Sequence, residues 1–159
     1  MPTFFICVKF GVFLLLNLML LWYNINIKEN IMKVEKLIKL AIKARENSYS
    51  PYSKFKVGAC ILAESGKVYL GCNVENASFG ATNCAERTAL FSAIANGERK
   101  FECIAIVGSN TDYTFPCGVC RQVLSEFGDM KVIIAKDEQN YKEFMLSNLL
   151  PNSFNKGSF

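Results

Sequence analysis

Apolar residues recur at helical spacing over residues 33–46 of the chain. Lysine and glutamate occupy most of the positions between them, so the pattern predicts a surface helix with one buried face. The polar stretch 47–51 ends in proline and is expected to terminate this helix. The buried stripe consists of Val34, Leu37, Ile38, Ala41 and Ala44.

Two strand-like runs follow, over residues 55–63 and 68–74. They are joined by residues 64–67, whose sequence Glu-Ser-Gly-Lys has the composition of a hairpin turn. We therefore expect the two runs to pair as antiparallel strands.

A second helix is predicted over residues 84–96, which are rich in alanine and leucine. Asn83 is a plausible N-cap for this helix, and Gly97 is placed as its C-terminal stop. The first turn of this buried helix would then contain Cys84 and Glu86.

The remaining pattern predicts a buried strand, a polar loop, another helix and two more strands. The helix should run for about ten residues after Pro116 and end near Gly128. The order of elements describes an α/β fold in which one mixed sheet packs against helices, without internal repeats or a dividing linker. The buried strand is expected at 101–107, the loop at 108–114, a core strand at 131–135 and a fourth or edge strand at 141–146.

Residues 1–31 form an apolar N-terminal extension that does not fit this pattern. The segment 4–23 is almost wholly apolar, yet nothing resembling a small-residue cleavage site follows it. An upstream start codon read in error would produce such a segment, and a genuine membrane segment is the alternative. We expect residues 32–159 to form the functional domain and to be cytoplasmic, with no membrane contact unless residues 1–31 are genuine.

Composition narrows the chemistry that is available to this domain. The 159 residues are 51% hydrophobic, which suits one compact domain. A net charge of +4 without a concentrated basic run does not indicate a nucleic-acid partner. The absence of histidine excludes Ser/His/Asp triads, Cys/His proteases and histidine-ligated zinc.

Cysteine usage points to a metal site. The seven cysteines form an odd set without the spacing of a secreted disulfide framework, so reduced thiols or metal ligands fit better. Cys117 and Cys120 are three residues apart after Pro116, and Cys84 begins the earlier helix. If both helices start at the same sheet edge, three thiols converge where helix dipoles favour thiolates, and three ligands leave an open position typical of catalytic zinc. Glu86 lies close enough to handle a proton there.

The cysteine segments with Glu86, together with several other stretches of the chain, resemble the cytidine deaminase family, and the likeness covers nearly all of residues 33–154. The likeness implies a three-layer cytidine deaminase-like fold, with a mixed sheet of about five strands between helices, and one Zn²⁺ per subunit. The polar loop 109–115 has no close match to the family. The matching segments are Ser53–Ala59, Gly71–Ala77, Cys84–Arg87, Pro116–Cys120 and Leu149–Phe154.

The resemblance implies hydrolytic deamination of cytidine and deoxycytidine, as in pyrimidine salvage. Zinc-activated water would attack C4 of cytosine, while Glu86 takes the water proton, protonates N3 and delivers a proton to the leaving amine. Asn73 and Glu75 should hydrogen-bond the ribose, and Phe55 should pack against the base. The family's all-cysteine variant goes with homotetramers, in which Phe154 would reach a neighbouring subunit's site.

Zinc binding by three thiolates leaves a net charge of −1 at the metal. Arg87, next to Glu86, is our candidate donor to a thiolate, which would draw charge back from the sulfur. The resemblance assigns Cys84, Cys117 and Cys120 as the zinc ligands.

Other interpretations compete with this one. A structural four-cysteine zinc site would need Cys60, Cys72 or Cys103, each of which lies in an apolar strand-like run where cysteine is commonly a small hydrophobe. The rival enzyme is a deaminase of another base or of polynucleotides. A non-catalytic zinc-binding interaction domain is the rival class, and Glu86→Gln would then change nothing measurable. Without the resemblance, Asn73, Glu75 and Phe55 would be ordinary loop and core residues.

Overall fold

The computed structural model describes residue 19 and residues 33–109 and 112–158. The chain divides into two units, Met1–Lys33 and Val34–Phe159, and only Met19 and Lys33 of the first are described. Apart from Met19, the predicted extension 1–31 therefore lies outside the described residues. Within the described ranges, no helix is both long enough and apolar enough to cross a membrane.

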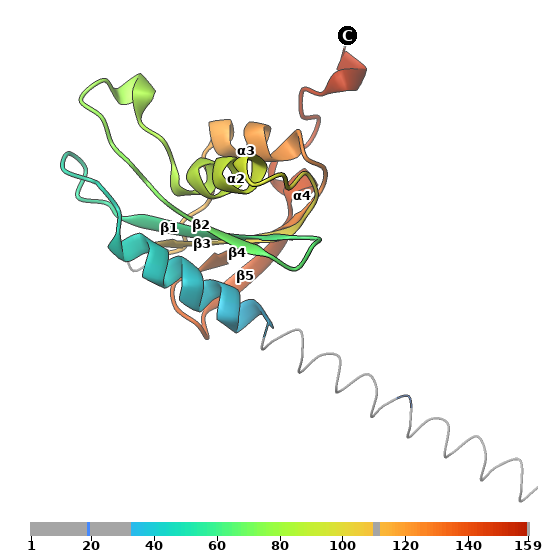
Figure 1. The fold of residues 1–159 in the computed structure, drawn as a ribbon, viewed down its shortest axis with the longest axis horizontal. Coiled ribbons are helices and arrows are strands. Elements are labelled where there is room, and N and C mark those ends of the chain that lie inside the picture. The colour runs from blue at the N-terminus through green and yellow to red at the C-terminus, as the bar shows by residue number, and fades with distance from the viewer. Residues whose placement is uncertain (1–18, 20–32, 110–111, 159) are drawn as a thin grey trace, which may run out of the picture. The chain divides into compact units, whose positions relative to one another are not determined.

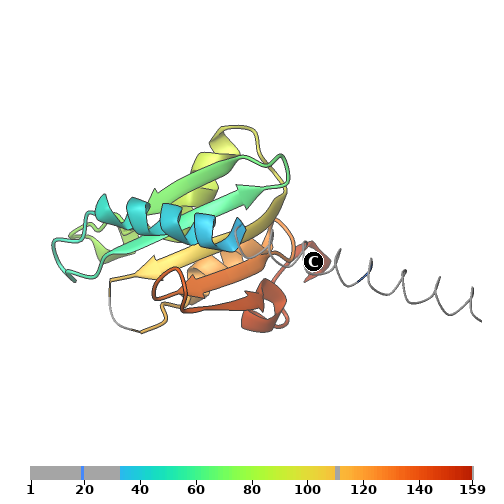
Figure 2. The same cartoon turned by 90° about the horizontal axis from the view of Figure 1, so that it is seen from below.

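The second unit is built on one five-stranded sheet with the strand order β2-β1-β3-β4-β5 (Figures 1 and 2). Neighbouring strands pair antiparallel except β3 and β4, which are parallel, so the prediction of a mixed sheet is confirmed. The β1–β2 pair is the expected hairpin, and β5 is an edge strand. The strands are β1 Val57–Ala63, β2 Val68–Cys72, β3 Phe101–Gly108, β4 Lys131–Ala135 and β5 Tyr141–Met145.

Helices cover both faces of this sheet, which gives the expected three layers. The helix over residues 33–46 packs on one face, where its apolar stripe meets the alternate strand residues Cys60 and Leu62. The opposite face carries α2 Ala85–Ala95, α3 Gly118–Ser125 and α4 Leu146–Leu149 (Figure 1). Strand β1 is buried along its whole length because both faces are covered.

Several element ends differ from the sequence prediction for identifiable reasons. Strand β2 ends at Cys72 because the side chain of Asn73, rather than its backbone carbonyl, accepts the hydrogen bond of Val57 N. Gly97 and Gly128 both have positive φ, as expected of residues that follow a helix, but α3 ends at Ser125. Helix α4 was not predicted, since four residues are too few to show a period.

Candidate active site

Three cysteine sulfurs meet at the N-termini of α2 and α3. Cys84 is the N-cap residue of α2, Cys117 is the N-cap residue of α3, and Cys120 is buried in the first turn of α3. Their Sγ atoms all lie within 4.8 Å of one another, and the Cys84–Cys117 Sγ distance is 3.9 Å. The positive ends of two helix dipoles therefore face the sulfurs of this three-cysteine cluster.

The prediction that Asn83 is the N-cap of α2 was wrong by one residue. The backbone of Asn83 forms a two-way bridge with Val74, with N–O distances of 2.9 and 3.0 Å, which keeps Asn83 extended. Its side-chain amide donates to Thr88 Oγ1 instead of capping the helix. Cys84 thus stands before the first turn rather than in it, with its backbone in the extended region.

Hydrogen bonds to the sulfur of Cys84 favour its thiolate form, which is the form that binds a metal cation. The pKa of Cys84 falls to about 5 because the Cys120 thiol donates a hydrogen bond to its sulfur and Arg87 adds another. The pKa of Cys120 rises for the reciprocal reason, with burial adding to the effect. A divalent metal that binds here displaces the remaining thiol protons, since thiolates are the ligands.

The geometry of the cluster fits a single zinc ion. Zn–S bonds of about 2.3 Å in a tetrahedron place sulfurs about 3.8 Å apart, close to the 3.9 Å between Cys84 and Cys117. Arg87 Nε is a buried donor that has no hydrogen-bond partner among the described residues. Such a donor suits a site that collects negative charge from thiolates. Three protein ligands leave the fourth tetrahedral position to water or substrate.

No fourth cysteine joins the cluster within the described residues. Cys60 and Cys103 are buried in the core on the other face of the sheet, where burial raises the pKa of Cys60 to about 12. The thiol of Cys72 donates to the carbonyl oxygen of Asn47 at 3.4 Å. The four-cysteine structural site considered from the sequence thus lacks its fourth ligand in this part of the chain.

Glu86 is the second residue of α2 and is only 4% exposed. Burial raises the pKa of its carboxyl from 4.5 to about 7, and the negative charge of Cys84 adds to the rise. A carboxyl with a pKa near neutrality can both accept and release a proton at pH 7, as a general acid–base group must. The structure therefore brings a proton-carrying group next to a metal-binding cluster.

Arg87 follows Glu86 in α2 and contacts Cys84. Its Nη2 donates to the carbonyl oxygen of Thr82 at 2.9 Å and lies 3.7 Å from Cys84 Sγ. The sequence predicted that Arg87 donates to a thiolate. It did not indicate which cysteine is involved, nor that Arg87 also donates to the carbonyl oxygen of Thr82. The Thr82 carbonyl fixes the guanidinium so that it faces the sulfur.

Asn73, a predicted ribose-binding residue, is 8% exposed and ties the loop before β1 to the end of β2. Its Oδ1 accepts hydrogen bonds from Val57 N at 2.8 Å and Ser48 Oγ at 2.5 Å. Its Nδ2 donates to the carbonyl oxygen of Phe55 at 2.8 Å. The amide of Asn73 thus holds the backbone on both sides of Lys56.

Glu75, the other predicted ribose-binding residue, is bonded to the same loop but also faces a pocket. It accepts hydrogen bonds from Tyr52 N, Ser53 N and Ser53 Oγ, and the Ser53 hydroxyl is the main reason that the pKa of Glu75 is lowered. The pocket holds about 410 Å³ and is also lined by Phe79 and Thr82. Sequence reasoning missed Tyr52 and Phe79, whose exposed rings pack edge to face.

The two predicted aromatic substrate contacts lie in different surroundings. Phe55 is partly buried against the core cluster that contains the α2 residues, and a Cβ on Gly108 would lie 3.0 Å from its Cζ. Phe154 is 63% exposed, and its carbonyl oxygen accepts a hydrogen bond from Gln122 Nε2 of α3 at 2.7 Å. The structure does not bring Phe154 into the pocket beside Glu75.

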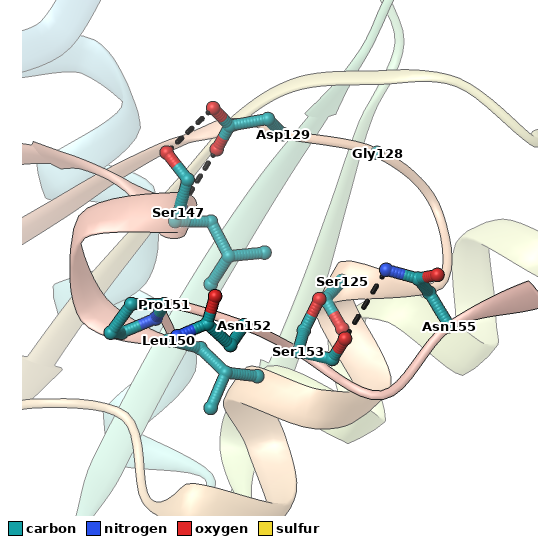
Figure 3. Close-up of a pocket in the computed structure, with 10 residues that line it drawn as sticks. Ser125, Gly128, Asp129, Ser147, Leu150, Pro151, Asn152, Ser153 and Asn155 are labelled. Carbon is teal, nitrogen blue, oxygen red and sulfur yellow. Dashed lines mark hydrogen bonds between the residues drawn. The ribbon is translucent and has the colours of Figure 1, made fainter. Parts of the chain in front are cut away.

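A second hollow of about 280 Å³ lies between the end of α3 and the C-terminal segment (Figure 3). Asp129 closes one side by accepting hydrogen bonds from the backbone and hydroxyl of Ser147. None of the predicted site residues lines this hollow. The candidate active site is therefore assigned to the three-cysteine cluster and Glu86.

A cation-binding cluster with an adjacent acid–base group on an α/β frame defines a hydrolytic metalloenzyme of the zinc type. The family model for the cytidine and deoxycytidylate deaminase zinc-binding region matches residues 31–136. The chain belongs to this family.

Known relatives support the same assignment across most of their length. A cytidine deaminase of Sporosarcina psychrophila is 49% identical over 127 residues, which cover 79% of this chain and 93% of the relative. A crystal structure of cytidine deaminase from Burkholderia pseudomallei matches with a TM-score of 0.71 and 49% identity, over 75% of this chain and 97% of that one. A crystal structure of cytidine deaminase from Mycobacterium tuberculosis matches with a TM-score of 0.66 and 38% identity, over 75% of this chain and 94% of that one.

Proposed function

We propose that this chain catalyses the hydrolytic deamination of cytidine and deoxycytidine, releasing ammonia, and serves pyrimidine salvage in the cytoplasm. The observation that carries the proposal is the buried carboxyl of Glu86, with a pKa near 7, beside three converging cysteine sulfurs. Relatives that share half of the aligned residues are named cytidine deaminases. We assign residues 32–159 as the catalytic domain.

In this proposal Cys84, Cys117 and Cys120 hold one zinc ion per subunit. Bound zinc supplies Lewis-acid activation of a water molecule. Glu86 would accept one proton of the attacking water and carry it to N3 of the cytosine ring, and would then carry the second proton of that water to the departing amine at C4. Its raised pKa allows each of these transfers without a large energetic penalty.

Arg87 compensates for the charge of three thiolates in this scheme. Its guanidinium, fixed by the Thr82 carbonyl, faces Cys84 at 3.7 Å and withdraws electron density from the sulfur. The unpartnered Nε supplies a second donor within the same buried space. A less electron-rich sulfur makes the metal a stronger Lewis acid.

Substrate recognition is assigned to the loops around the pocket beside Glu75. Phe55 packs against the base, while Asn73 and Glu75 bind the ribose. Both polar side chains also hydrogen-bond residues of the segment 48–57, so ribose binding and the order of this segment are coupled. In a homotetramer, the exposed Phe154 reaches the site of a neighbouring subunit.

The proposal is tested by offering the zinc-loaded protein a panel of substrates. Cytidine and deoxycytidine are expected to yield uridine and deoxyuridine with one ammonia each, while adenosine, guanosine and a cytosine-containing single-stranded oligonucleotide stay unchanged. Turnover of the oligonucleotide or of a purine nucleoside in place of cytidine would overturn the substrate assignment. A protein that loses its fold with the metal yet turns over none of these substrates would be a structural zinc domain.

The tetramer is tested separately by sedimentation velocity of the same protein. A species of four subunits is expected. A monomer with full activity would contradict the shared-site role of Phe154, since no neighbouring subunit would then be present.

A further inference from the structure

Two glycines of the β1–β2 hairpin allow helices to approach the sheet more closely than any other residue would permit. A Cβ on Gly71 of β2 would lie 2.3 Å from both Ala85 O and Ala89 N, which are backbone atoms of α2. A Cβ on Gly58 of β1 would lie 2.0 Å from the carbonyl oxygen of Ala41 in the helix over residues 33–46. The two glycines therefore serve opposite faces of the same hairpin.

Gly71 supports the part of α2 that carries the chemistry. Ala85 stands between Cys84 and Glu86, and its backbone oxygen is one of the two atoms that would lie closest to a Cβ on Gly71. Farther along the chain, the two-way bridge between Val74 and Asn83 fixes the residue before Cys84. The start of α2 is thus held to the end of β2 at two neighbouring points.

We propose that Gly71 is a positioning residue of the zinc site. By allowing α2 to lie directly on β2, it sets the place of Cys84 Sγ and of the Glu86 carboxyl relative to Cys117 and Cys120 of α3. This inference rests on the proposed zinc chemistry of the site. It gives the close packing of α2 on Gly71 as the reason that Cys84 and Glu86 lie where they do.

The expected displacement is large compared with what a metal site tolerates. Carbon and backbone atoms at 2.3 Å must separate by roughly 1 Å to reach ordinary contact. Zinc–ligand distances hold to within about 0.2 Å. Since the opposing atoms are backbone, no side-chain rotation relieves the contact, so α2 and the edge strand β2 must separate. Cys84 and Glu86 are expected to shift relative to Cys117 and Cys120, because the atoms nearest to the added Cβ belong to α2 and none belongs to α3.

Gly58 provides a matched control. Its Cβ would meet the backbone of Ala41 and Arg45, so Gly58→Ala creates a contact at least as close as Gly71→Ala does. The helix that it displaces covers the other face of the sheet and contains no predicted zinc ligand or acid–base group. Both substitutions should lower stability, but only Gly71→Ala should disturb the metal site.

The experiment compares the full-length wild type, Gly71→Ala and Gly58→Ala by zinc competition against a chromophoric chelator. Thermal unfolding in excess chelator measures stability in parallel. Gly71→Ala is expected to weaken zinc binding by at least about tenfold, and Gly58→Ala by less than about threefold. If both variants lose stability equally and keep the wild-type zinc affinity, Gly71 is a packing residue only and the inference is wrong.

Ala89→Ser keeps the test decisive if Gly71→Ala does not fold. Ala89 is fully buried, and its backbone N and Cα are among the atoms nearest to a Cβ on Gly71, so the added oxygen enters the packed side of α2 at this contact, where it can donate to the carbonyl oxygen of Ala85. A smaller loss of zinc affinity is expected, with kcat falling more than KM changes because the acid–base group moves with the helix. Unchanged zinc affinity and kcat would contradict the inference. A wild type that binds zinc but does not deaminate cytidine would refute the proposed function, while the affinities still decide the role of Gly71.

Discussion

Replacing Glu86 by glutamine should make the folded protein more stable at pH 8 but not at pH 4.5. The carboxyl is 4% exposed, and its pKa in the fold is about 7, against 4.5 for an ordinary glutamate. At roughly 1.4 kcal/mol for each pH unit, this difference corresponds to about 3 kcal/mol. Glutamine has nearly the same shape and never ionises, so it isolates the cost of the buried charge.

The sign follows from the raised pKa. The folded protein binds the Glu86 proton more tightly than the unfolded chain does, so this contribution to stability is fully present below pH 4.5. It is lost as the pH rises through 7, where the folded protein must bury a carboxylate. The stability of Glu86→Gln relative to the wild type should therefore grow between pH 4.5 and pH 8 and reach about 3 kcal/mol.

Urea unfolding of both proteins at several pH values measures this difference, with a chelator present so that no bound cation contributes. Far-ultraviolet circular dichroism follows the unfolding transition. A stability difference that stays constant from pH 4.5 to pH 8 would refute the account of Glu86 as a buried group with a pKa near neutrality.

Three further substitutions test other parts of the site. Cys84→Ser removes a ligand and should reduce bound zinc to less than about a tenth of the wild-type content by metal analysis; full retention would exclude Cys84 as a ligand. Arg87→Gln should weaken zinc binding about tenfold in a chelator competition, and equal affinity would leave Arg87 with a purely structural contact. Asn73→Ala leaves Val57 N and the Phe55 carbonyl without their partner and should cost about 3 kcal/mol in urea unfolding; a loss below about 0.5 kcal/mol would show that water replaces the amide.

The parts of the site that sequence predicted best depend on local chain geometry. Cys117 is the N-cap residue of α3, Cys120 lies three residues later in its first turn, and Pro116 precedes both as a helix-start signal. Each relation involves a few neighbouring residues, so residue order alone carries it. The convergence of the three thiols was predicted only on the condition that both helices start at the same edge of the sheet, and the three sulfurs do lie together in the structure.

Features that depend on contacts between distant segments were missed. Asn83 is not the N-cap of α2 because its backbone pairs with Val74, a contact that no helix propensity reveals. Asn73 extends the β1–β2 pairing with its side chain, so β2 ends two residues earlier than its apolar pattern indicated. The close approach at Gly71 likewise appears only when strand and helix are seen together.

The most direct test of the central claim follows the ultraviolet absorbance of cytidine during reaction with zinc-loaded wild type and zinc-loaded Glu86→Gln. The account predicts turnover by the wild type and a loss of at least about a hundredfold in the variant, with bound zinc equal in both. Equal turnover by the two proteins would contradict the claim that Glu86 moves the protons of the reaction. Absence of turnover by a fully zinc-loaded wild type would contradict the proposed function itself.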